Sequence, residues 1–426
     1  MILAVAVAPA AETFYTYVGW IEPDSVLLAW GTAEGKGNTI GFESASHGPA
    51  IVRIGGKEIQ ENHRNWVDVR GLQPDTTYPY EISVKGRVAG KGSVRTHPLQ
   101  SRRLAFFVIG DFGDASKAQR RIAAAMAAEF EKRRQSDNPV RFVLTTGDDI
   151  YADTVLGIPV RNSGDEDRDW RTKFFGPYQP ILRHIPFYAT PGNHDGNASE
   201  SRGDLDVYLD NFFFPGNHPG RYYMFSYGGG LANFFALDST ENTEVGPPSP
   251  YYYEDGVQSL WLKQMLDRSQ PVHAPPAAWN IAYFHHPLYS AGPRHEPMLN
   301  ELLHWQRWFE AGGVQVVFNG HEHNFQVSDA SRTVGIRYFV TGAGGQLRPS
   351  NIRARLYDAR IVGWAPQNHF LLVEIDNDVM RVTPLADEPV VPVTAEGPPL
   401  PLPIKVQVQI KRRPQPVTQD AAGAPR

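Results

Sequence analysis

The chain has 426 residues, a formal net charge of -5 and no cysteine, and 41% of its residues are hydrophobic. This composition is typical of a soluble protein with enough apolar material for two or three domains, and the mild acidity argues against a nucleic-acid binder that depends on a broad basic surface. Without cysteine there are no disulfides, zinc-thiolate sites, iron–sulfur clusters or cysteine nucleophiles, so any metal has to be held by oxygen and imidazole ligands.

The N-terminal segment MILAVAVAPAAE, residues 1–12, is apolar but lacks the positive n-region of a signal peptide. It is interpreted either as the remnant of an export signal or as a disordered end. No apolar run in the chain reaches the ~18 residues that a membrane-spanning helix needs.

Residues 12–98 are predicted to form an all-β domain, since short alternating runs such as 25–30 and 50–54 are separated by turns rich in Gly and Asn. The segment GLQPDTTYPYEISV (71–84) places a Leu and a Pro before a Tyr that opens a β-rich run, which predicts the tyrosine corner of a sandwich. With the following GSVRTHP it resembles the end of a fibronectin type III module. The alternative is a generic pair of β-hairpins.

Residues 102–390 alternate between apolar strands and helical stretches, which indicates an α/β domain whose sheets are covered on both faces. Helices are predicted over 115–134, 257–267 and 297–310. Strands are predicted over 104–109, 141–146, 185–190, 232–237, 279–284, 314–319, 336–341 and 369–375. Residues 391–426 form a Pro-rich C-terminal tail, in which the alternating run 404–411 predicts an additional edge strand.

Metal-ligand residue types follow five of these strands. The clusters are Asp111 after 104–109, Asp148 after 141–146, Asn193 and His194 after 185–190, His285 and His286 after 279–284, and His321 and His323 after 314–319. Each motif alone is as often a turn or a polar loop as a functional site. Because sites in open α/β sheets lie outside the carboxyl ends of the strands, all five clusters are expected to converge on one cleft.

The motifs GDFG, GDDIY, GNHD, HHP and GHEH, in this order, resemble the five blocks of the calcineurin-like metallophosphoesterases. The variant with Gly113 and Tyr151 is similar to the purple acid phosphatases, of which those of plants and many bacteria carry a fibronectin-like domain ahead of the catalytic one. The resemblance covers about residues 12–390. It implies a fibronectin type III-like all-β sandwich followed by an α/β metallophosphoesterase domain, with two mixed β-sheets flanked by helices.

The resemblance also implies a dinuclear metal centre whose bound hydroxide attacks the phosphate. The first metal, Fe(III), would be held by Asp111, Tyr151 and His323, and the second, which is Fe(II), Zn or Mn, by Asn193, His285 and His321, with Asp148 bridging the two. His194 would hydrogen-bond the phosphate or protonate the leaving oxygen. His286 and His295 are further catalytic candidates, and for His286 a packing role is the alternative.

The function predicted from the sequence is hydrolysis of phosphate monoesters on small-molecule substrates, as an acid phosphatase. One alternative is a phosphodiesterase or nucleotide pyrophosphatase on the same scaffold, which the acidic loop 153–170 would help to decide. An alternative from another class is a non-catalytic binding protein with a vestigial metal site. No nucleic-acid partner and no membrane span are expected, and the resemblance implies a secreted or periplasmic protein.

Overall fold

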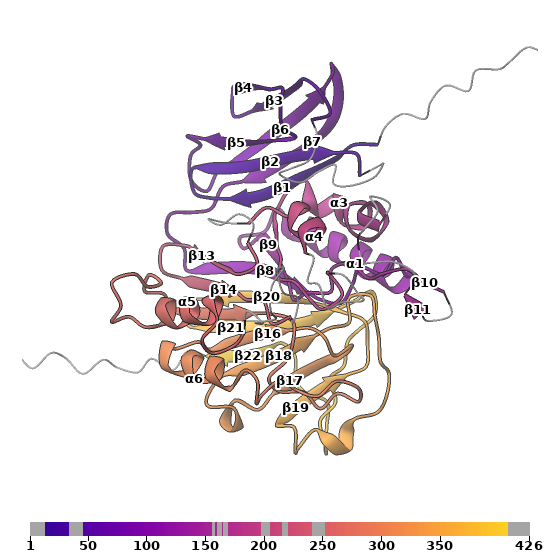
Figure 1. Cartoon of the computed structure of the whole chain (residues 1–426), viewed down its shortest axis with the longest axis vertical. Helices are drawn as coiled ribbons and strands as arrows, with labels where there is room; N and C mark the ends of the chain where they lie inside the picture. Colours follow the sequence, from indigo (N-terminus) through magenta and orange to yellow (C-terminus); the bar gives the residue numbers. More distant parts are fainter. Residues whose placement is uncertain are drawn as a thin grey trace, which may run out of the picture.

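The computed structural model describes residues 13–33, 46–155, 158–159, 164, 169–196, 205–214, 220–240 and 252–407. The N-terminal segment 1–12 and most of the acidic loop 153–170 lie outside the described residues. Figure 1 shows a β-sandwich at one end of the molecule and two larger sheets, with helices beside them, forming the rest. Among the described residues no helix is both long and apolar enough to span a bilayer.

The N-terminal region folds as two packed antiparallel sheets, which confirms the predicted all-β sandwich. The first sheet has the order β1 (Tyr15–Ile21), β2 (Ser25–Gly31), β5 (Trp66–Arg70), and the second the order β4 (Lys57–Glu61), β3 (Ala50–Ile54), β6 (Thr77–Val84), β7 (Arg87–Arg95). Inward-facing residues of both sheets, among them Trp30, Val52 and Ile82, form one apolar core. The fibronectin type III resemblance itself stays a prediction.

The predicted tyrosine corner is present. The hydroxyl of Tyr78 in β6 accepts a hydrogen bond of 2.8 Å from the backbone N–H of Gln73, five residues earlier. Such a bond from the start of a strand back to the preceding loop is the defining contact of the corner. It fixes the connection between β5 and β6, which belong to different sheets.

Two mixed sheets form the remainder of the described fold. One has the order β12 (Phe187–Tyr188), β9 (Val140–Thr145), β8 (Arg103–Ile109), β20 (Phe370–Asp376), β21 (Val379–Leu385), β22 (Ile404–Gln407). The other has the order β13 (Tyr223–Tyr227), β14 (Ala232–Ala236), β15 (Trp279–Tyr283), β16 (Val316–Asn319), β18 (Arg337–Thr341), β17 (Phe325–Ser328), β19 (Ile361–Ala365). The predicted additional strand is β22, which pairs antiparallel with β21 at the edge of the first sheet.

The two mixed sheets pack face to face. Phe106 of β8 lies edge-on to Phe234 of β14 and to Phe318 of β16, with ring centroids 5.3 and 6.2 Å apart. This aromatic layer confirms the predicted pair of packed mixed sheets. The division of the chain into domains at 98, 102 and 390 stays a prediction.

Helices cover the sheets on their other faces. The first sheet is accompanied by α1 (Lys117–Arg133), a π-helical turn (Trp170–Phe175), α3 (Gly176–Leu182) and α4 (Asp206–Asp210), and the second by α5 (Val257–Leu266) and α6 (Leu303–Gly312). Short pieces complete the list: the hairpin β10 (Thr154–Val155) and β11 (Ile158–Pro159), and the 3-10 turns Ala330–Arg332 and Arg353–Arg355.

One predicted helix is shorter than expected. The helix predicted over 297–310 begins at Leu303, because the N–H of Met298 donates to the carbonyl of Pro287 at 2.9 Å and ties this part of the chain to the loop after β15. At its other end α6 stops at Gly313, whose φ of 71° gives the left-handed cap that glycine favours.

The sandwich is fixed to the larger unit by polar contacts. Arg141 of β9, nearly buried, pairs with Asp75 of the sandwich at 2.9 Å. The hydroxyl of Tyr80 donates to the carbonyl of Arg183 at 2.8 Å. Strand β1 of the sandwich also lies against α3 and β12. The sandwich is therefore on the side of the molecule away from α5 and α6 (Figure 1).

Candidate metal centre

The loops that follow β8, β9, β15 and β16 meet at one edge of the two sheets. Three of the predicted metal ligands in these loops, Asp111, Asp148 and His321, have positive φ angles of 56°, 54° and 68°. Non-glycine residues adopt this left-handed conformation at an energetic cost, and they tend to do so at functional sites. Here the turn after each strand aims a polar side chain into the space between the loops.

The first group of ligand atoms surrounds the phenol of Tyr151. Its oxygen lies 2.9 Å from Oδ2 of Asp148 and 3.3 Å from both Oδ1 of Asp111 and Nε2 of His323. His323 Nε2 is in turn 3.3 Å from Asp111 Oδ1. All four side chains are buried, so the structure brings together the set that was predicted for the first metal.

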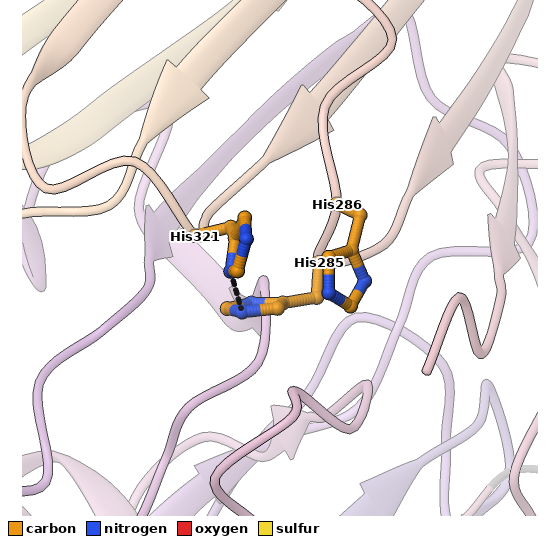
Figure 2. Close-up of side chains that lie close together, drawn as sticks. All are labelled: His285, His286 and His321. Atoms are coloured by element: carbon orange, nitrogen blue, oxygen red, sulfur yellow. Dashed lines mark hydrogen bonds between the residues drawn. The ribbon is translucent and has the colours of Figure 1, made fainter. Parts of the chain in front are cut away.

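The second group is centred on His285. Its Nε2 lies 3.0 Å from Oδ1 of Asn193, 3.1 Å from Nδ1 of His321 and 3.4 Å from Oδ2 of Asp148. Figure 2 shows the imidazoles of His285 and His321 meeting nitrogen to nitrogen, with His286 beside them. Asp148 thus faces both groups, because its Oδ2 is close both to the phenol of Tyr151 and to Nε2 of His285.

The donor chemistry of the second group fits a cation. Nδ1 of His285 lies 2.8 Å from the carbonyl oxygen of Thr146, which can only accept, so this nitrogen carries a proton and Nε2 is the nitrogen available to a metal. Nε2 faces the amide oxygen of Asn193, the carboxylate of Asp148 and Nδ1 of His321. Buried oxygen and imidazole nitrogen atoms grouped this closely suit a metal ion, and a backbone carbonyl on the other ring nitrogen is the usual support of a metal-binding histidine.

The protonation equilibria agree with this arrangement. Burial raises the pKa of Asp111 to about 7, and the charge of nearby Asp148 acts in the same direction. Burial alone would raise the pKa of Asp148 as well. Positive charge on nearby His285 and His194, together with hydrogen bonds from the His194 backbone and the Tyr151 hydroxyl, outweighs burial and lowers that pKa to about 2. Burial lowers the pKa of His323 to about 4, with a further contribution from Arg348, so this imidazole is neutral at neutral pH and able to bind a metal.

The three predicted catalytic histidines also lie at this centre. The backbone N–H of His194 donates to Asp148 Oδ1 at 2.8 Å, and its ring is 4.7 Å from that of Tyr151. The rings of His286 and His295 are 4.4 and 4.0 Å from the ring of His321. His286 also contacts Ser239 Oγ through Nδ1 at 3.0 Å. The structure therefore brings every predicted site residue together, while their individual roles stay predictions.

Three further residues hold the centre in place and were missed from the sequence. Buried Lys173 donates to the carbonyl of Tyr151 at 2.7 Å and pairs with Asp153 at 2.8 Å. Glu322 is buried between the two histidines of GHEH, and Arg348 contacts it. A lysine among the aromatics of WRTKFF and a carboxylate between two metal-ligand histidines were visible signals. For Arg348, in a Gly-rich loop, the sequence gives no signal.

Comparison with known proteins identifies the class of this protein. The calcineurin-like phosphoesterase family matches residues 104–325, a range that contains all five motifs, and the chain belongs to this family. Its relatives include purple acid phosphatases. Tartrate-resistant acid phosphatase type 5 of Rattus norvegicus is 27% identical over 263 residues, which cover 58% of this chain and 74% of that protein.

Two further similarities agree with this membership. Fe(3+)-Zn(2+) purple acid phosphatase 12 of Arabidopsis thaliana is 26% identical over 281 residues, which cover 63% of this chain and 52% of that protein. The structure of a purple acid phosphatase from yellow lupin seeds superimposes with a TM-score of 0.63 at 14% identity, and the match covers 89% of this chain and 72% of that one. The structural match extends over most of the chain and supports the predicted succession of a β-rich region and an α/β domain.

Proposed function

We propose that the protein is a phosphatase that hydrolyses phosphate monoesters, with an acidic pH optimum, at a centre of two metal ions. The observation that supports this most is the position of Asp148, whose carboxylate lies 2.9 Å from the Tyr151 phenol in one ligand group and 3.4 Å from His285 Nε2 in the other. A carboxylate between two ligand groups is the natural bridge of a dinuclear site.

In this proposal the chain divides its ligands by chemistry. Asp111, Tyr151 and His323 hold the first ion, for which the anionic phenolate and carboxylate suit Fe(III). Asn193, His285 and His321 hold the second, and an amide oxygen with two imidazoles suits Fe(II), Zn or Mn. The Fe(3+)-Zn(2+) designation of the Arabidopsis relative supports this pairing. When bound, the ions supply Lewis acidity toward the phosphoryl oxygens and make water a stronger acid.

The protein's own groups orient the phosphate and handle the proton. His194 is half-buried beside Tyr151, and its backbone is fixed by Asp148 Oδ1, so its imidazole is held at the centre, where it can donate a proton to the leaving oxygen. The rings of His295 and His286 contact the ring of His321, and both histidines would donate hydrogen bonds to the phosphate. The bond between His286 and Ser239 fixes the orientation of that ring.

The completeness of the ligand set argues against a vestigial site, because a decayed centre would have lost some of these buried polar side chains. Export of the protein is part of the proposal only through the family resemblance, since residues 1–12 lie outside the described residues.

Two measurements test the proposal on the purified protein. Elemental analysis should find about two metal ions per chain, with iron among them. Turnover of p-nitrophenyl phosphate and of bis(p-nitrophenyl) phosphate, measured from about pH 4 to about pH 8, should favour the monoester and reach its maximum on the acidic side. Faster hydrolysis of the diester would favour the phosphodiesterase alternative, and a protein without metal or turnover would favour the binding protein.

A further inference from the structure

Glu322 is a buried carboxylate that links two loops beside the metal centre. It stands between the metal-ligand histidines His321 and His323, and its side chain is 0% exposed. Its Oε2 accepts from the backbone N–H of His295 at 3.2 Å, and its Oε1 lies 3.4 Å from Nη1 of Arg348. One carboxylate therefore holds the loop of His295 and the loop of Arg348 against the GHEH turn.

The packing of these loops is tight. A Cβ added to Gly292 would come within 2.3 Å of the carboxylate of Glu322, so this close approach requires a glycine. Nη1 of Arg355 donates to the carbonyl of Gly292 at 2.7 Å and fixes the loop from the other side. The backbone N–H of Arg348 donates to the carbonyl of His323 at 2.8 Å. The guanidinium of Arg348 is thus carried by backbone that is bonded to the metal centre itself.

Arg348 has more donors than this contact uses. A guanidinium offers five N–H donors, and among the described residues Glu322 is the carboxylate that pairs with it, through a single contact of 3.4 Å. The side chain is 16% exposed, so ligands can reach it. It is also close enough to His295 and His323 to add to the lowering of their pKa values by burial. A cation beside a site for two metal ions is repelled by them unless an anion lies between.

We propose that Arg348 binds a second anionic group of the substrate, so that the preferred substrates are phosphate monoesters that carry a further carboxylate or phosphate. Glu322 is the positioning residue that orients the guanidinium. The planar fork of arginine pairs in a bidentate manner with either oxyanion, and exposed Arg294, next to His295, adds positive charge on the same loop. This inference rests on the proposed phosphatase function, and it adds the substrate class.

The test measures equilibrium binding, so its outcome does not depend on turnover. The metal-loaded full-length protein is titrated by calorimetry with propylphosphonate and with 3-phosphonopropionate, which share a carbon skeleton and differ by a terminal carboxylate. The unaltered protein should bind the second ligand about tenfold more tightly or better. Arg348→Met should reduce that preference to about twofold or less. Propane-1,3-diphosphonate, as a third ligand, shows whether a second phosphate is bound more tightly than a carboxylate.

The matched control is Arg353→Met, which removes the same charge from an exposed 3-10 turn nearby in the chain and should keep the preference. If Arg348→Met weakens the binding of all ligands equally, the guanidinium binds the phosphonate group that all of them share. If the preference is unaltered, Arg348 has only a structural role. Either result overturns the proposal. If Arg348→Met does not fold, Arg348→Lys keeps the charge without the fork and should lower the preference several-fold. An unchanged preference in this variant overturns the proposal equally.

Kinetics provide the link to the proposed function. For Arg348→Met, kcat/KM should fall about tenfold more for 3-phosphoglycerate than for glycerol 3-phosphate, mainly through KM. A protein that shows the binding preference but hydrolyses neither ester would refute the phosphatase proposal while the binding result still stands.

Discussion

The phenol oxygen of Tyr151 lies 2.9 Å from Oδ2 of Asp148, three residues earlier in the chain. The backbone N–H of Tyr151 donates to the carbonyl of Gly113 at 2.8 Å. This bond joins the loop of the proposed ligand Tyr151 to the loop that carries Asp111. Burial and the neighbouring carboxylates raise the pKa of Tyr151 well above 10, and the phenol therefore needs a strongly acidic metal ion to become a ligand.

Tyr151→Phe should bleach the protein. If the phenolate binds Fe(III), the iron-loaded protein has a visible charge-transfer band, and removing one oxygen abolishes it while the ring still packs against His194. Retention of the first metal should weaken as well, because a buried ligand is lost. Absorption spectra and iron content of the two proteins check this. Tyr227→Phe, a buried tyrosine of β13, is the matched control and should keep the band. Equal colour and iron content in Tyr151→Phe would show that the tyrosine only packs.

Substitutions at the centre should fall into two classes. Asp148→Ala and His321→Ala each remove a proposed metal ligand and should abolish turnover together with metal binding. His194→Ala should keep both metals, while kcat falls by ~10²–10⁴, the range typical of lost acid–base catalysis. Metal analysis beside steady-state kinetics separates the classes, with partly exposed His273→Ala as a control that should behave like the unaltered protein. Full activity in His194→Ala would exclude it from the mechanism.

The sequence predicted the strands and the convergence of the proposed ligands, because most of these residues follow an apolar run that is buried as expected, as in β8 and β9. It could not predict which strands are neighbours. β20 pairs with β8 although more than 250 residues separate them along the chain, and no local pattern encodes such pairing. The contact between Glu322 and Arg348 depends on the same long-range arrangement, since the two residues meet only when the loops after β16 and β18 are placed together.

Acid should destabilise the protein through a histidine far from the metal centre. His97 is buried edge-on between Phe142 and Tyr227, and burial, with a smaller contribution from the charge of Arg141, lowers its pKa from 6.5 to about 3. Between these values the unfolded chain binds a proton that the folded chain does not. The free energy of unfolding therefore decreases as the pH falls through this window, by up to ~1.4 kcal/mol per pH unit.

His97→Phe removes this titration and should flatten the dependence of stability on pH by up to that amount. Urea unfolding of both proteins between about pH 6.5 and about pH 4 measures the slopes, and the difference between them cancels the pH dependence of metal binding. His273→Phe, at a partly exposed position, should leave the slope unaltered. A slope in His97→Phe equal to that of the unaltered protein would show that His97 is protonated to the same extent in both states.

Gly113 should not tolerate any side chain, so a histidine placed there should not serve as an additional metal ligand. A Cβ at this position would lie 1.7 Å from the carbonyl oxygen of Asp149 and 2.9 Å from Cα of Ile150, both of which are backbone atoms. The chain from Asp148 to Tyr151 would have to shift, and it carries two of the proposed ligands. Overpacking of this kind costs ~1–3 kcal/mol. Gly113→Ala and Gly113→His should therefore both lower the midpoint of thermal unfolding and lose metal.

The control for these variants is Gly335→Ala. Gly335 has a φ of +82° and open space around it, so alanine there causes backbone strain of about 1 kcal/mol without a steric clash. Thermal unfolding and elemental analysis of all three variants separate strain from displacement of the metal centre. Gly335→Ala should keep its metal, whereas both Gly113 variants should not. A Gly113→His protein that binds the first metal as tightly as the unaltered protein would mean that the loop can move aside.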